Sequence, residues 1–250
     1  FGFLGPSGAG KSTTQNILIG LLTGWTGTVE VMGRPLPTWG PDYYRGIGVS
    51  FELPNHYLKL TARENLAYFH ALHDGETDDP EAVLALVGLD GDADKPVAAF
   101  SKGMKNRLNL ARSLLHRPKL WFLDEPTAGL DPVNAVRIRE IIRERQTQGV
   151  TVVVTTHDMH TAEEVCDRVA FIVDGQIRTI DAPEALRRQH GQREVELRWD
   201  GAPVERFDLD GLADDAGFLA ALRRPGLQAI HSQEATLEDV FVEVTGRRLK

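Results

Sequence analysis

The segment Gly5–Thr13 constrains the fold of this chain more than any other sequence feature. It contains the pattern G-x-x-x-x-G-K-S, with an apolar run at Phe1–Leu4 before it and a helical stretch at Ser12–Leu22 after it. A glycine-rich turn between a strand and a helix directs backbone N–H groups and the positive end of the helix dipole toward an anion. We therefore expect a phosphate-binding loop formed by Gly5, Pro6, Ser7, Gly8, Ala9, Gly10, Lys11, Ser12 and Thr13.

Two side chains of this loop have specific expected roles. Lys11 is expected to reach the β and γ phosphates of a nucleotide, and the Ser12 hydroxyl is expected to bind Mg²⁺. The alternative is a glycine-rich turn that holds no ligand. The strand before the loop and the helix after it favour the phosphate loop, because the motif functions only in that context.

The fold class follows from apolar runs that alternate with helical patterns up to about residue 180. This alternation is typical of an α/β protein whose parallel sheet is covered by helices. The Asp174-Gly175 pair predicts a hairpin, so we expect an antiparallel strand at one edge of the sheet. The expected strands are Phe1–Leu4, Thr28–Met32, Ile47–Phe51, Lys119–Leu123, Val150–Thr155, Arg168–Val173 and Gln176–Ile180.

Two segments depart from this alternation. The block from about residue 61 to 116 begins with the capping pattern Thr61-Ala62-Arg63-Glu64 and has no strand pattern, so we expect a helical insertion. After residue 190, Val195, Leu197 and Trp199 alternate with charged residues before a further helical pattern. We expect a main domain at residues 1–190 and a small α/β appendage at residues 191–250.

Composition excludes several classes of protein. The chain has 36 acidic and 28 basic residues, a net charge of −8, which opposes binding to nucleic acid. Its one cysteine, Cys166, allows no internal disulfide and no cysteine metal cluster, which indicates a reducing compartment. No apolar stretch approaches the roughly 18 residues of a membrane span, and the start of the chain does not read as a signal peptide.

Acidic side chains follow the apolar run Leu120–Leu123, which is an expected strand. Asp124 and Glu125 would therefore lie at the carboxyl edge of the sheet, where open α/β folds bind ligands. We expect Asp124 to bind Mg²⁺ and Glu125 to activate water. His157 follows another strand at the same edge and would contact the γ phosphate or the water, although each of these residues alone also suits a solvated turn.

Four motifs together resemble the nucleotide-binding subunit of ABC transporters. They are the phosphate loop, Phe100–Leu108, Leu123–Pro132 and Thr156–Asp158, and their order and spacing agree over about residues 1 to 190. The resemblance implies an ATPase that uses ATP and Mg²⁺, with Glu125 as catalytic base and His157 as a second catalytic residue. In one departure from the family, the antiparallel strands and the adenine-stacking aromatic residue that normally precede the phosphate loop are missing before Phe1.

The resemblance further implies partners. Two copies, or this chain and a paired ATPase subunit, would form composite sites that the signature residues Ser101, Lys102, Gly103 and Met104 complete in trans. Asp131 would lie in the loop between the sites. A separate membrane-spanning permease would hold the dimer at the cytoplasmic face of the cell membrane. Its cytoplasmic helix would contact the surface near Glu52–Leu72, and no nucleic acid would bind.

The sequence departs from the family pattern in two motifs. Glu52 stands where the family has a glutamine, so we expect it to lie near the metal, and the signature reads Ser-Lys-Gly-Met. That signature, with the tail Ala235–Gly246, resembles bacterial drug and antibiotic exporters. We therefore expect ATP-driven export of a small molecule. The alternatives are a soluble ABC ATPase that acts on nucleic acid or ribosomes, and a nucleotide-binding module without turnover.

Overall fold

The computed structural model describes residues 1–190, 194–233 and 235–247, and divides them into two compact units. The first unit is Phe1–Ile180, and the second begins at Asp181. This division falls before the boundary at residue 190 that the sequence suggested. The reason is that helix α8 (Pro183–His190) packs against helix α10 (Leu237–Thr245) of the second unit.

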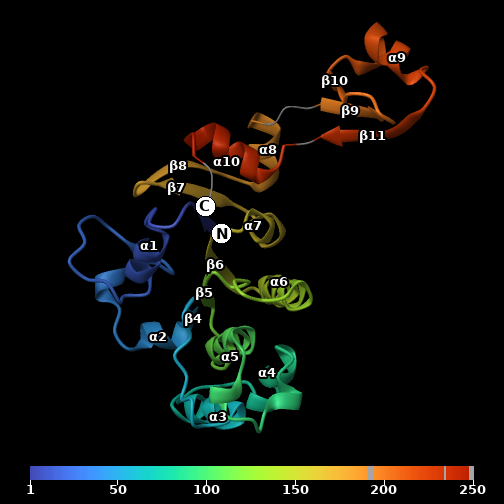
Figure 1. Cartoon of the computed structure of the whole chain (residues 1–250). Helices are drawn as coiled ribbons and strands as arrows, with labels where there is room; N and C mark the ends of the chain where they lie inside the picture. The colour runs from blue at the N-terminus through green and yellow to red at the C-terminus, as the bar shows by residue number, and fades with distance from the viewer. Residues whose placement is uncertain (191–193, 234, 248–250) are drawn as a thin grey trace. The chain divides into compact units, whose positions relative to one another are not determined.

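The first unit is built on a six-stranded sheet with the order β4-β5-β6-β1-β7-β8. Neighbouring strands from β4 to β7 run parallel, as the alternation of strands and helices predicted. Helices α1 (Lys11–Leu18) and α7 (Met159–Val165) both contact β6, and Figure 1 shows them on opposite sides of the strands. The strands are β4 (Ile47–Ser50), β5 (Leu120–Asp124), β6 (Thr151–Thr156), β1 (Gly2–Leu4), β7 (Val169–Val173) and β8 (Gln176–Asp181).

The Asp174-Gly175 hairpin is confirmed. Asp174 and Gly175 have φ values of 52° and 72°, the left-handed geometry that a two-residue hairpin turn requires. This turn connects β7 to the edge strand β8.

One expected strand is wrong. Thr28–Met32 was expected among the strands of the sheet, but only β2 (Glu30–Val31) forms there, and it pairs with β3 (Arg34–Pro35) in a separate two-stranded antiparallel sheet. Met32 and Gly33 have φ values of 51° and 74°, so the chain reverses after two strand residues. A short 3₁₀ turn, Leu36–Thr38, and helix α2 (Asp42–Gly46) then lead to β4.

The expected helical insertion is present between β4 and β5. It contains α3 (Ala62–Ala71), α4 (Pro80–Leu86) and α5 (Lys102–Leu114). The Thr61 hydroxyl accepts a hydrogen bond from the Glu64 amide at 3.1 Å, and the Glu64 carboxylate accepts from the Thr61 amide at 2.8 Å. This reciprocal pair is the capping box that the sequence predicted, and it fixes where α3 begins.

Helix α6 (Pro132–Thr147) follows β5. Ile142 of α6 and Leu123 of β5 are both buried in the core.

The second unit has a three-stranded antiparallel sheet with β9 (Glu194–Trp199) between β10 (Glu205–Asp208) and β11 (Leu227–Gln233). Val195 and Leu197 pack with Ala221 of α9 (Ala216–Leu222), which accounts for the alternation seen in the sequence. Within residues 1–190, 194–233 and 235–247, none of the helices has the length and hydropathy of a membrane span.

Candidate nucleotide-binding site

The phosphate loop lies between β1 and α1, where the motif requires it. Gly8 and Gly10 have φ values of 79° and 107°, which side-chain-bearing residues rarely adopt. A Cβ atom on Gly5 would come within 2.2 Å of the Ile172 carbonyl oxygen, so the loop also needs glycine there. Among the described residues, no side chain caps the N-terminus of α1 at Gly10, and the N–H groups of its first turn therefore remain available to an anion.

Lys11 is the cation of this loop, and it is only 8% exposed. Its Nζ donates hydrogen bonds to the carbonyl oxygens of Gly5 at 2.6 Å and Pro6 at 3.1 Å. Burial lowers the pKa of Lys11, while the carboxylates of Glu125, Asp124 and Glu52 act in the opposite direction. A phosphate oxygen would replace the two carbonyl oxygens as the acceptor for this ammonium group.

A cavity of about 280 Å³ brings the loop and the acids together. Asp124 ends β5, Glu125 follows it, and Glu52 lies beyond the end of β4, so these acids share the carboxyl edge of the parallel sheet. Burial raises the pKa of Asp124, because its charged form is costly in this setting. The lining residues are Ser7, Gly8, Gly10, Lys11, Ser12, Thr13, Glu52, Asp124 and Glu125.

Glu125 is held tightly at the rim of this cavity. Its side chain is 10% exposed, and its backbone has the left-handed φ of 47°. The carboxylate accepts hydrogen bonds from the Thr156 hydroxyl at 2.8 Å and from the His157 amide at 3.0 Å. The Nδ1 atom of His157 lies 2.7 Å from Oε1 of the same carboxylate. The structure thus joins the two expected catalytic residues directly, although His157 itself does not line the cavity.

The donor chemistry at this edge suits Mg²⁺. The Ser12 hydroxyl and the Asp124 carboxylate both line the cavity, and Mg²⁺ prefers one or two protein oxygen ligands together with substrate phosphates. Glu52 adds a third oxygen donor to the same cavity. Among the residues that the structure describes, no cluster of histidine, cysteine and acidic side chains forms an all-protein metal centre.

The signature residues lie outside the phosphate cavity of their own chain. The Ser101 hydroxyl caps α5 and accepts from the Met104 amide at 3.2 Å, while Lys102 packs against Gly129 in the loop before α6. Gly103 also lies close to Gly129, since a Cβ atom built on it would be 3.4 Å from the Gly129 carbonyl oxygen.

Asp131 is exposed at the end of the same loop. Its carboxylate accepts from the Asn134 amide at 3.0 Å, so it caps α6. A hydrogen bond of 2.8 Å from the Asn106 side chain to the Ala128 carbonyl oxygen ties α5 to this loop. The signature and the loop therefore form one connected surface.

Sequence reasoning assigned no role to Thr155 and Thr156, the two threonines that bond to the acids. The Thr155 hydroxyl donates to Asp124, and the Thr156 hydroxyl donates to Glu125. The local signals were two polar residues after the apolar run Val152–Val154 and the place of Thr156 in the motif Thr156–Asp158, and neither identifies a bonding partner.

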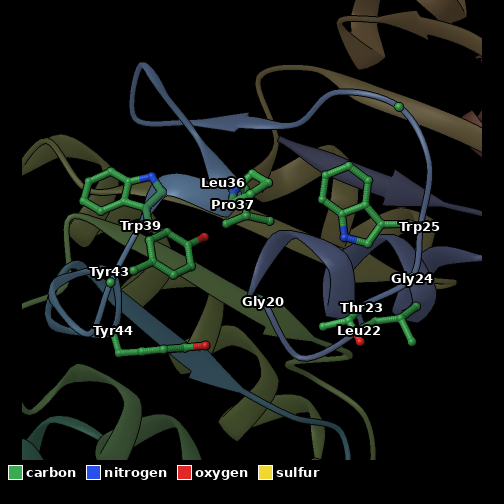
Figure 2. Close-up of a pocket in the computed structure, with 12 residues that line it drawn as sticks. Gly20, Leu22, Thr23, Gly24, Trp25, Leu36, Pro37, Trp39, Tyr43 and Tyr44 are labelled. Atoms are coloured by element: carbon green, nitrogen blue, oxygen red, sulfur yellow. The ribbon is translucent and has the colours of Figure 1, made fainter.

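A second and larger cavity, of about 510 Å³, lies beyond the end of α1. Figure 2 shows Trp25 on one side of it and Trp39 with Tyr43 on the other. Its lining is aromatic and apolar and contains no acidic or basic side chain, so this cavity does not provide the charges that a nucleotide phosphate needs.

Taken together, a glycine-rich loop on a parallel sheet, a buried lysine and acids at the same sheet edge define a phosphate-loop nucleotide hydrolase. Comparison with known proteins gives the family. The family model described as "ABC transporter" matches residues 1–128, and the model described as "Fluoroquinolone efflux ABC transporter C-terminal domain" matches residues 193–234.

The chain is also similar to curated proteins along its whole length. It is 56% identical over 253 residues to a fluoroquinolones export ATP-binding protein of Mycobacterium tuberculosis, with 100% of this chain and 84% of that protein covered. It is 35% identical over 271 residues to a Nod factor export ATP-binding protein I of Burkholderia orbicola, with 100% of this chain and 89% of that protein covered.

Solved structures agree with this assignment. The ATP-binding subunit of an ABC transporter superposes with a TM-score of 0.67 at 29% identity, over 75% of this chain and 80% of that one. A dimeric ATP-binding cassette in a post-hydrolysis state, bound to ADP and Pi, gives 0.65 at 27% identity, over 72% and 84% of the two chains. The chain belongs to the ABC transporter family, as an ATP-binding domain of the exporter type that binds and hydrolyses ATP.

Proposed function

We propose that this chain hydrolyses Mg²⁺-bound ATP at the cavity of Lys11, Asp124 and Glu125, and so drives export of a drug-like small molecule through a separate permease. The observation that carries the proposal is that one cavity joins the phosphate loop to both acids. The fluoroquinolones export relative, at 56% identity, supports a fluoroquinolone as the first cargo to test.

The proposed chemistry assigns a step to each group. The N–H groups of the loop and the Lys11 ammonium bind the phosphates of ATP. Ser12 and Asp124 would hold Mg²⁺, with Glu52 near it, and the ion supplies positive charge that neutralises the phosphates. Glu125 orients the attacking water and accepts its proton, because its carboxylate is fixed at the rim of the cavity. His157, bonded to Glu125, keeps this carboxylate in place.

The dimer completes each site in this proposal. Ser101, Lys102, Gly103 and Met104 are at or near the N-terminus of α5 and lie outside their own chain's cavity, which suits residues that act in trans. Asp131 lies at the end of the loop that Asn106 of α5 binds through the Ala128 carbonyl oxygen. In the dimer this loop would lie between the two ATP sites. The dimeric relative bound to ADP and Pi supports this arrangement.

The permease is proposed to bind the surface from Glu52 to Leu72, which would place the dimer at the cytoplasmic face of the membrane. This surface exposes Leu53 (78%), Leu58 (51%) and Leu72 (59%), an unusual density of large apolar side chains. Tyr57 and Tyr68 stack edge to face beside them at 5.0 Å. An amphipathic helix would cover such a surface.

The test measures phosphate release by the purified full-length chain, then drug accumulation in cells. We expect Mg²⁺-dependent turnover that the variant Glu125→Gln abolishes. In cells that lack the chromosomal copy, wild type should lower accumulation of a fluorescent fluoroquinolone and Glu125→Gln should not. Turnover stimulated strongly by nucleic acid would instead support the soluble ABC ATPase, and the absence of Mg²⁺-dependent turnover would support a binding module.

A further inference from the structure

Two consecutive threonines end β6 directly beside the two acids that end β5. In the parallel register, Thr155 lies opposite Asp124, and the Glu125 amide donates to the Thr155 carbonyl oxygen at 2.8 Å. Thr155 and Thr156 are both completely buried. Each threonine hydroxyl is bonded to a different one of the two acids.

The Thr155 hydroxyl bonds to Oδ1 of Asp124. The Gln15 side-chain oxygen, at 3.2 Å, and the Leu123 carbonyl oxygen, at 3.4 Å, lie farther from the same hydroxyl. A hydroxyl has a single proton to donate, and a charged acceptor attracts it more strongly than a neutral one. The bond therefore fixes the Asp124 carboxylate in one orientation at the lining of the cavity.

The Thr156 hydroxyl has both a donor and an acceptor role. It donates to Oε2 of Glu125 at 2.8 Å and accepts from the Asp158 amide at 3.0 Å. Because the backbone fixes the Asp158 amide, the hydroxyl cannot rotate freely. Together with the bond from the His157 amide to Oε1, it anchors both oxygens of Glu125. Glu125 needs this kind of support, because a non-glycine residue with a left-handed backbone conformation is strained.

We propose that Thr155 and Thr156 are positioning residues with separate tasks, an inference that rests on the proposed function. Thr155 orients Asp124 toward the metal, and Thr156 holds Glu125 in line with the attacking water. A purely structural role would require only that the buried hydroxyls find some acceptor. The positioning role and a purely structural role differ in what they predict. Only in the positioning role does Thr155 affect metal affinity while Thr156 affects kcat.

The experiment compares Thr155→Val and Thr156→Val, which keep the side-chain shape, with Thr155→Ser and Thr156→Ser, which keep the hydroxyl. Thr151→Val, at the exposed start of the same strand, is the matched control. Three quantities are measured: kcat and KM for ATP, affinity for Mn²⁺ by electron paramagnetic resonance with a non-hydrolysable ATP analogue, and Tm.

Removing a side chain that orients a residue of a metal site typically lowers metal affinity or activity about 10- to 100-fold. For Thr156→Val we expect that loss in kcat, with Mn²⁺ affinity and KM within about twofold of wild type. For Thr155→Val we expect the same loss of about 10- to 100-fold in Mn²⁺ affinity. Both serine variants should recover to within about threefold of wild type, because the hydroxyl is restored.

The proposal is overturned if Thr156→Val turns over ATP as fast as Thr156→Ser, or if both valine variants lower the same quantity equally. If a valine variant does not fold, as its Tm would reveal, the alanine variant at that position is compared with serine in its place. Loss of Mg²⁺-dependent turnover in the wild-type chain would overturn the proposed function itself. Wild-type turnover combined with an unaffected Thr156→Val would overturn only the positioning role.

Discussion

The variant Glu125→Gln separates catalysis from folding, because the amide preserves the shape of the carboxylate. The glutamine oxygen can still accept from the His157 amide, as Oε1 of Glu125 does at 3.0 Å. The amide NH₂ group would then lie where Oε2 now accepts from the Thr156 hydroxyl at 2.8 Å. That hydroxyl loses its acceptor and would accept from the amide instead, while it also accepts from the Asp158 amide.

The cost to stability follows from this exchange of one hydrogen bond. It amounts to about 1 kcal/mol, or roughly 2–4 °C in Tm for a domain of this size. The cost to catalysis is much larger, because an amide cannot accept the proton of the attacking water. Loss of a general base lowers kcat by about 10²- to 10⁴-fold, which corresponds to roughly 2.7–5.4 kcal/mol.

The assay is steady-state phosphate release with excess Mg²⁺ and ATP, together with ATP affinity by fluorescence and Tm by calorimetry. We expect kcat to fall by at least about 100-fold while ATP affinity stays within a few fold of wild type. A kcat within about threefold of wild type at unchanged affinity would refute the assignment of Glu125 as the base. A large drop in Tm would show that the lost activity comes from unfolding.

Three further predictions concern residues outside the nucleotide-binding site. Thr61→Ala removes the α3 capping box and should lower the free energy of unfolding, measured by urea titration, by about 1 kcal/mol. Thr61→Ser should have nearly the wild-type stability. Equal stability of the two variants would contradict the capping role of the Thr61 hydroxyl. Burial raises the pKa of the Cys166 thiol to about 11, so native protein at pH 8 should react with iodoacetamide far more slowly than urea-unfolded protein, and equal rates would contradict its burial. Burial lowers the pKa of His56 to about 4, from an ordinary value near 6.5. Between pH 6.5 and 4 the imidazole is therefore protonated in the unfolded chain but largely neutral in the folded one. The free energy of unfolding should fall as the pH falls through this range. His56→Gln should flatten this dependence in urea titrations, and an unchanged slope would contradict the assignment.

Local chemistry made much of the site predictable from the sequence. The phosphate loop carries its own turn geometry, and the acids follow an apolar strand, so their shared edge could be inferred before any coordinates. The capping box of Thr61 is likewise contained within four neighbouring positions. Each of these features depends on residues close together in sequence.

The remaining features depend on contacts between distant segments. The short β2 strand is an exception, because the local left-handed turn at Met32 and Gly33 ends it, although the apolar pattern through Met32 favoured a longer strand. The bonds from Thr155 and Thr156 to the acids join positions 31 residues apart, and they exist only because β5 and β6 pair in one register. The assignment of α8 to the second unit comes from packing against α10, far along the chain.

We propose that two copies of this chain close around ATP, which each copy's phosphate loop binds together with the other copy's signature residues. Analytical ultracentrifugation of the Glu125→Gln variant, which we expect to hold ATP without hydrolysing it, tests this dimer. We expect a monomer without nucleotide or with ADP, and a dimer with Mg²⁺ and ATP. A monomer under all three conditions, or a dimer that forms equally well without nucleotide, would contradict it.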